Sequence, residues 1–105
     1  MGVIQATFTV IYRWKVAAPD HEAFKQHWAD LTRAIKHERG GLGSRLHLDK
    51  EGVFVAYAQW PDNATWQEAR EQPSPLPKAG EAMSSLVVER FEPEVLDVVA
   101  DLIET

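Results

Sequence analysis

The sequence predicts an α+β protein with the ferredoxin-like split βαβ arrangement, a four-stranded antiparallel sheet with helices on one face. Residues 7–16 and 53–60 alternate between apolar and polar or small side chains, which is typical of strands. Apolar residues recur at steps of three and four from Phe24 to Ile35, which predicts an amphipathic helix. With 45% apolar and 26% charged residues, we expect residues 1–105 to form one folded domain.

The first half of the chain predicts strand, helix and strand. The alternation in residues 7–16, TFTVIYRWKV, indicates the first strand. Pro19 suits a first helical position, and Asp20 complements the positive end of the helix dipole. We expect this helix to end at Gly40, and the alternating residues 42–49 to form the second strand.

The second half of the chain predicts a third strand, which forms a hairpin with the second, followed by shorter helices, a fourth strand and a C-terminal helix. Residues 53–60, VFVAYAQW, predict a third strand that pairs with the second. Asp62 is a plausible N-cap for a short helix that ends before a proline-rich loop, and residues 79–84 allow a further helical turn. Residues 86–91 predict the fourth strand, and residues 93–104, which begin with a proline and carry an apolar stripe, predict a C-terminal helix.

Composition and spacing exclude several classes of partner. A net charge of −5 makes nucleic acid and anionic lipid poor partners, and the N-terminal residues show neither a basic leader nor a cleavage site, so we expect no export and no membrane association. The absence of cysteine fits a cytoplasmic protein. The third strand resembles an RNA-binding signature only in part, because Glu51 and Gly52 replace its glycine and one aromatic residue. No His, Asp or Glu spacing suggests a metal site.

One face of the predicted sheet is left without helices. Depending on register, the third strand presents to that face either Val55, Tyr57 and Gln59 or the alternate residues Phe54 to Trp60. Both sets are largely apolar, and a patch of this kind is typical of an interface. The sequence therefore predicts a homodimer packed sheet to sheet.

Four local features carry a resemblance to a known family. They are the helix ending "HERGGLGSRLH", the hairpin, the "YAQW" that ends the third strand, and the "SP" after the second helix. With the element order, they make residues 7–92 similar to the antibiotic biosynthesis monooxygenase family of dimeric α+β barrels. The resemblance implies a cofactor-independent monooxygenase that oxidises a small aromatic or polyketide-like molecule with dioxygen.

The resemblance also implies positions for a site. In the quinone-forming members, a tryptophan matches Trp60, an asparagine stands where this chain has Ala56, and a tyrosine stands where it has Trp66. The haem-degrading branch has an axial histidine near Ala79, where this chain has none, so we expect no haem and no other cofactor. Because alanine cannot bond substrate oxygens, the alternative is a non-catalytic dimeric protein that binds a small molecule or acts as a scaffold.

The residues themselves indicate a pocket with few polar groups. Trp60 offers an aromatic wall and one N–H donor but cannot accept a proton, so His27 or His47 is the candidate base. Core packing alone is the competing interpretation of Trp60 and Trp66. For His27 the competing interpretation is a residue that flanks the helical stripe, and for His47 it is a strand residue at the dimer face. The candidate catalytic residues are Trp60, His27 and His47, and the candidate substrate-binding residues are Tyr12, Trp14, Trp28, Arg45, Phe54, Ala56 and Trp66.

Overall fold

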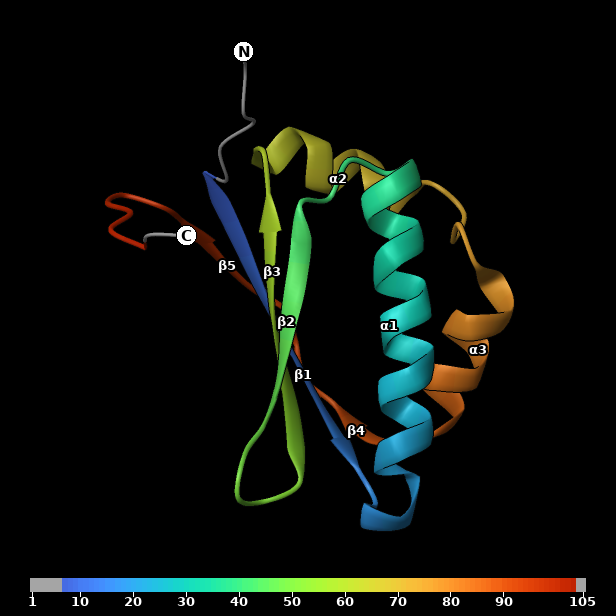
Figure 1. The fold of residues 1–105 in the computed structure, drawn as a ribbon. Coiled ribbons are helices and arrows are strands. Elements are labelled where there is room, and N and C mark those ends of the chain that lie inside the picture. The colour runs from blue at the N-terminus through green and yellow to red at the C-terminus, as the bar shows by residue number, and fades with distance from the viewer. Residues whose placement is uncertain (1–6, 104–105) are drawn as a thin grey trace.

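The computed structural model describes residues 7–103, which form a five-stranded antiparallel sheet with helices on one side (Figure 1). The strand order β2-β3-β1-β4 confirms the predicted ferredoxin-like arrangement, and β5 joins the sheet beside β1. The strands are β1 (Phe8–Val16), β2 (Gly43–Leu48), β3 (Val53–Trp60), β4 (Val87–Arg90) and β5 (Glu94–Asp97).

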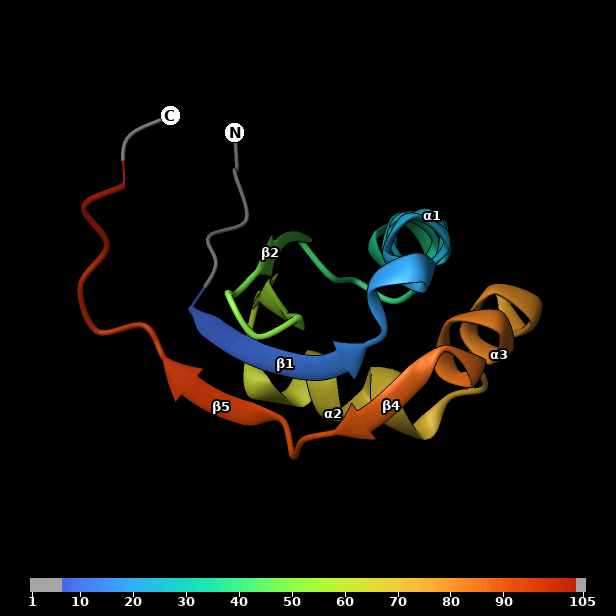
Figure 2. The ribbon, with the colours of Figure 1, turned by 90° about the horizontal axis from the view of Figure 1, so that it is seen from below.

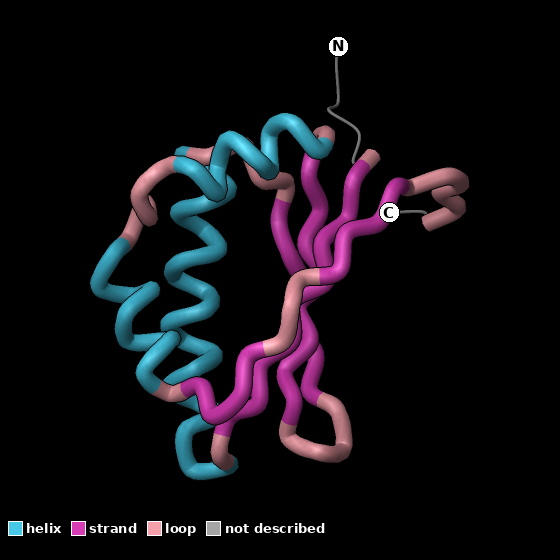
Figure 3. Tube along the Cα trace, turned by 180° about the vertical axis from the view of Figure 1, so that it is seen from behind, coloured by secondary structure: helices cyan, strands magenta, loops and turns pink. Residues whose placement is uncertain are grey.

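The two helices that cover the sheet come from different parts of the chain. Helix α1 and helix α3 lie side by side on one face, while α2 lies across the end of the sheet near the C-terminal end of β3 (Figures 1 and 3). A view along the strands shows the same two layers (Figure 2). The helices are α1 (His21–Glu38), preceded by a 3-10 turn η1 (Ala18–Asp20), α2 (Asn63–Glu71) and α3 (Pro77–Ser85).

Strand β3 alternates strictly between the helix side and the outer side of the sheet. Phe54, Ala56, Ala58 and Trp60 are buried, and the residues between them are partly exposed. The register pairs Tyr12 with Ala56. Because directly paired residues point to the same face, Tyr12 also faces the helices.

The core beneath the N-terminal half of α1 is aromatic. Phe24, which is fully buried, stacks on Phe54 with ring centroids 4.8 Å apart and meets Trp14 at 5.5 Å. A second buried cluster around Trp60 and Trp66 lies toward the end where α2 covers the sheet. These two clusters fix the ends of the space between α1 and the sheet.

The turns are built by the residues expected there. Gly52 closes the β2–β3 hairpin with a φ of 82°, which side chains other than glycine rarely adopt. The predicted N-cap is confirmed, since the Asp62 carboxylate accepts a 2.7 Å hydrogen bond from the Thr65 N–H. The predicted helical turn at 79–84 is part of the longer helix α3.

The predicted C-terminal helix is wrong. Residues 94–97 form strand β5, which pairs with Phe8–Ile11 of β1, and residues 98–103 contain no helix; residue 104 lies outside the described residues. The cause is tertiary: β4 pairs with β1 only between Trp14 and Val16, so the first half of the same edge would otherwise lack a partner. The sheet thus has five strands where four were expected. Within residues 7–103, no helix combines the length and apolar character needed to cross a membrane.

Candidate functional site

A cavity of about 210 Å³ lies between the sheet and the C-terminal half of α1. Strands β1, β2 and β3 form its floor, α1 forms its roof, and α3 contributes one methionine. Its lining residues are Tyr12, Trp14, Trp28, Leu31, Thr32, Ile35, Lys36, Gly41, Gly43, Ser44, Ala56, Ala58, Gln59, Trp60 and Met83.

The hollow exists because the middle of β3 carries small side chains. Ala56 and Ala58 face the helices between the bulky residues Phe54 and Trp60. Two alanines therefore leave open the space that larger side chains would fill. Gly41 closes one end at short range, because a Cβ atom there would lie 3.5 Å from the Trp60 ring.

Trp60 lines this cavity and carries a hydrogen-bond donor that has no partner among the described residues. Its side chain is 4% exposed, and its Nε1 atom is buried with no hydrogen-bond partner among the described residues. Leaving a buried donor unpaired costs about 1–3 kcal/mol. A hydrogen-bond acceptor placed at this N–H would recover that cost.

Tyr12 supplies a second polar group. Its hydroxyl oxygen accepts a 2.8 Å hydrogen bond from the Trp66 Nε1–H. Burial raises the pKa of Tyr12, while the Trp66 hydrogen bond and the positive charge of Arg70 act in the opposite direction with smaller effect. The phenol is therefore protonated at neutral pH.

Trp66 lies behind this hydroxyl and does not line the cavity. It is 4% exposed, and its ring packs against Phe8 with centroids 5.7 Å apart. The Arg70 guanidinium sits 4.5 Å from the centroid of the Trp66 ring. Trp66, a predicted substrate-binding residue, thus lies outside the cavity and holds the Tyr12 hydroxyl instead.

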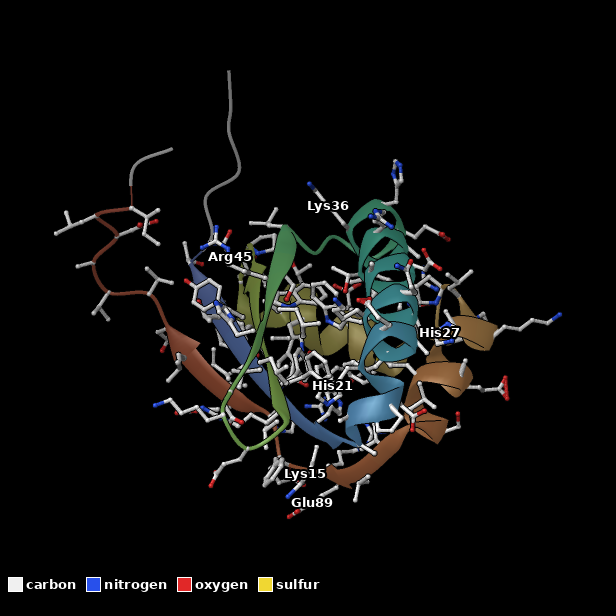
Figure 4. All side chains as sticks on the ribbon, turned by 60° about the horizontal axis from the view of Figure 1, so that its bottom comes forward. Lys15, His21, His27, Lys36, Arg45 and Glu89 are labelled. Atoms are coloured by element: carbon white, nitrogen blue, oxygen red, sulfur yellow. The ribbon has the colours of Figure 1, made fainter. Side chains whose placement is uncertain are left out.

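The other polar side chains of the lining are Lys36, which is exposed, and Thr32, Ser44 and Gln59, which are half-buried. Lys36 is its exposed cation, near the C-terminal end of α1 (Figure 4). Ser44 donates a 3.0 Å hydrogen bond to the Tyr57 carbonyl oxygen. Since Lys36 is exposed, it marks the side on which the cavity opens.

Neither predicted base lines the cavity. His27 lies on the side of α1 next to α3 (Figure 4). His47 pairs with Val55, so its side chain points to the outer face, where its Nδ1 lies 3.2 Å from the Val55 carbonyl oxygen. All four histidines of the chain are among the described residues, and none of them, nor any aspartate or glutamate of residues 7–103, lines the cavity.

Two of the predicted substrate-binding residues also lie elsewhere. Arg45 pairs with Tyr57 and is exposed on the side of β2 (Figure 4), and Phe54 is buried in the aromatic core below the cavity. Both line a separate, open groove between β2 and the first half of α1. His21 is half-buried: its Nε2 lies 2.8 Å from the Val16 carbonyl oxygen, and its ring packs edge-on against Phe54.

The cavity brings together Tyr12, Trp14, Trp28, Ala56 and Trp60 from the predicted set. The sequence reasoning did not assign the rest of the roof to a site, although its helical spacing held the signal. Leu31, Thr32, Ile35 and Lys36 follow Trp28 at steps of three and four, so they lie on the same side of α1. Among residues 7–103, no three His, Asp or Glu side chains gather in a way that could hold a metal ion.

Comparison with known proteins gives a family and a fold. The model of one family, described as antibiotic biosynthesis monooxygenase, matches residues 7–74. A search of curated proteins found no match.

Solved structures share the fold at low sequence identity. A cofactor-independent oxygenase of Streptomyces nogalater, SnoaB, in a variant with one asparagine replaced by alanine, is 24% identical, with 95% of this chain and 100% of that chain covered and a TM-score of 0.75. A protein of Caulobacter crescentus provisionally described as an antibiotic biosynthesis monooxygenase is 23% identical over 92% of this chain and 93% of that chain, also with a TM-score of 0.75. A protein of Bordetella bronchiseptica with the same provisional description is 14% identical over 91% and 100%, with a TM-score of 0.76.

Proposed function

Because the chain belongs to the antibiotic biosynthesis monooxygenase family, we propose that it is a cofactor-independent oxygenase that oxidises a small aromatic molecule with dioxygen in the cavity under α1. The observation that carries the proposal is the buried, unpartnered N–H of Trp60 in the wall of an aromatic-lined cavity. SnoaB, which has the same fold, is described as a cofactor-independent oxygenase.

The reaction in view oxidises the ring carbon para to a phenolic oxygen. The phenol loses its proton, and the phenolate passes one electron to dioxygen. The substrate radical and superoxide then combine in a C–O bond, and the peroxide takes up a proton. Loss of the C–H proton as the O–O bond breaks gives the quinone and hydroxide, which becomes water. The ring loses four electrons and dioxygen gains four, so no cofactor is required.

The lining suits this chemistry in two ways. Trp14, Trp28 and Trp60 provide aromatic faces on which a flat ring packs, and the alanines of β3 leave room for it. The N–H of Trp60 would stabilise the phenolate oxygen, where negative charge is greatest before the electron leaves. A mainly apolar site also excludes water from the radical pair and the peroxide.

The cavity of a single chain offers the substrate no histidine as a proton acceptor. His27 and His47 lie outside it, so their predicted role finds no support in its geometry. Burial raises the pKa of Tyr12, so its phenol is protonated at neutral pH and is no base. We therefore propose that the Trp60 N–H makes the bound phenol acidic enough to ionise without a histidine base.

Oxygen uptake tests the proposal. We expect wild-type protein to consume one dioxygen per 1,5-dihydroxynaphthalene and to form the coloured hydroxynaphthoquinone. Trp60→Phe should slow this reaction by about tenfold to a hundredfold, because one hydrogen bond to a charged oxygen is lost. Phe54→Leu is the matched control, since Phe54 is equally buried but lies outside the cavity. Equal rates in the wild type and Trp60→Phe would contradict the proposal.

A second candidate is a non-catalytic protein that binds the same kind of molecule. The observation that favours it is a cavity without histidine, aspartate or glutamate among its described lining residues. Tight binding of the dihydroxynaphthalene without oxygen uptake would support this alternative.

We also propose a cytoplasmic homodimer. The outer face of the sheet carries Ile11, Val55 and Tyr57, which pair or alternate to the side away from the helices. A second copy would cover these apolar side chains. Sedimentation at micromolar concentration should show a dimer in the wild type and a monomer in Val55→Glu.

A further inference from the structure

The hydrogen bond between Trp66 and Tyr12 has only one possible direction. An indole N–H donates and cannot accept, so the Tyr12 oxygen is the acceptor in the 2.8 Å contact. The hydroxyl hydrogen of Tyr12 must then point away from Trp66. Among residues 7–103 no acceptor takes that hydrogen, and Tyr12 lines the cavity.

This hydroxyl and the Trp60 indole belong to two side chains that both line the cavity. Tyr12 packs against both buried clusters, the one that contains Phe54 and the one that contains Trp60 and Trp66. The Tyr12 O–H and the Trp60 N–H are both donors without an acceptor among residues 7–103, and no histidine, aspartate or glutamate of those residues lines the cavity. The cavity wall is therefore complementary to a negatively charged oxygen that accepts hydrogen bonds.

The size of the cavity limits the ligand. Its volume of about 210 Å³ exceeds the roughly 150 Å³ that holds a benzene molecule. It is smaller than the roughly 300–1,000 Å³ typical of sites for drug-sized ligands. A flat molecule of one or two rings fits this range.

We propose that Tyr12 is a second substrate-binding donor, held by Trp66 as its positioning residue, and that with Trp60 it selects the phenolate form of one- and two-ring phenols. This inference rests on the proposed function for its substrate class. Arg70, stacked on the far side of Trp66, adds positive charge that favours the same anion. A neutral phenol binds less well because hydrogen bonds from these two donors to a charged oxygen are stronger than those to a neutral hydroxyl.

The binding of 4-nitrophenol tests the inference without turnover. This one-ring phenol changes absorbance when it ionises, so a titration reports the pKa of the bound probe. In the wild type we expect that pKa to lie below the value of the free probe. Tyr12→Phe should weaken phenolate binding by about tenfold or more and move the pKa of the bound probe back toward the free value. Trp66→Phe should act in the same direction by about twofold to tenfold.

Two controls separate a binding role from a structural one. Tyr57→Phe removes the same hydroxyl from the outer face of the sheet and should leave the titration unchanged. 4-Nitroanisole, which cannot ionise, should bind equally to the wild type and Tyr12→Phe. If Tyr12→Phe does not fold, the Trp66→Phe titration decides the question alone.

Three results would overturn the inference: a bound probe that titrates like the free one in the wild type, a Tyr12→Phe protein that matches the wild type, or an equal loss of 4-nitroanisole binding. A wild type that selects the phenolate but consumes no oxygen would sink the proposed oxygenase activity and leave this inference intact.

Discussion

Trp60 and Trp66 allow one substitution to be compared in two environments. Both side chains are tryptophans with 4% exposure, but the N–H of Trp66 bonds Tyr12 whereas that of Trp60 has no partner among the described residues. Changing each to phenylalanine removes the same ring atoms and the same donor. The difference between the two variants therefore reports whether the donor was paired.

The expected difference follows from the two hydrogen-bonding states. Removing the unpaired donor of Trp60 relieves about 1–3 kcal/mol, and removing the paired donor of Trp66 loses about 0.5–1.5 kcal/mol. The smaller ring leaves a void in each case, with a cost that largely cancels in the comparison. Trp60→Phe should thus be more stable than Trp66→Phe by about 1.5–4.5 kcal/mol. The weaker contact of Arg70 with phenylalanine at position 66 adds in the same direction.

Urea unfolding of the two variants and the wild type at pH 7 measures this difference. The slopes of the transitions must agree for the free energies of unfolding to be compared. We expect Trp60→Phe to keep nearly the stability of the wild type while it loses affinity for 4-nitrophenolate. The reasoning fails if Trp60→Phe is destabilised as much as Trp66→Phe and binds the probe normally, because Trp60 would then be ordinary core.

Three further changes test other parts of the molecule. Because the folded-state pKa of Tyr12 is raised above its ordinary value of 10.0, its contribution is fully present below pH 10.0 and is lost as pH rises further; alkaline unfolding should therefore be less steep in Tyr12→Phe. The Thr65 hydrogen bonds lower the pKa of Asp62 below 3.8, so Asp62→Ala should lower the melting temperature at pH 7 but have a smaller effect as pH falls below that range. Ala56→Leu should fill the cavity and abolish 4-nitrophenol binding, with circular dichroism unchanged.

The alternating sequence pattern predicted the central strands β1 and β3. The structure of residues 94–97 depends instead on strand pairing, which the pattern does not show. Side chains of β3 alternate in burial over the whole strand, and the bounds of β1 and β3 are close to those expected. After Pro93, the apolar residues from Val95 to Ile103 recur at helical steps, yet residues 94–97 form a strand. The edge of β1 near Phe8 decides between helix and strand, because residues 94–97 pair with it. This contact joins residues distant in sequence, so local periodicity does not reveal it.

The site was predictable where residue type alone decides the role. Tyr12, Trp14, Trp28, Ala56 and Trp60 were assigned to a site and line the cavity, whereas the aromatic residues Phe54 and Trp66 were assigned to it and lie outside. The sequence did not show that Arg45 and His47 lie outside the cavity. The register of the β2–β3 pairing places their side chains on the outer face, and this register is not visible in the sequence. The hydrogen bond between Trp66 and Tyr12 joins residues 54 positions apart, so no local sequence pattern predicts it.

The pairing of β1 with β5 brings Thr7 and Val98 together, with the Val98 N–H donating to the Thr7 carbonyl oxygen at 2.9 Å. A short linker between these positions would allow the chain to be circularly permuted, with new ends opened at the Lys50–Gly52 corner. The permuted chain would keep α1 covalently joined to β2. The cavity could therefore form from the same strands and helices in a different order along the chain.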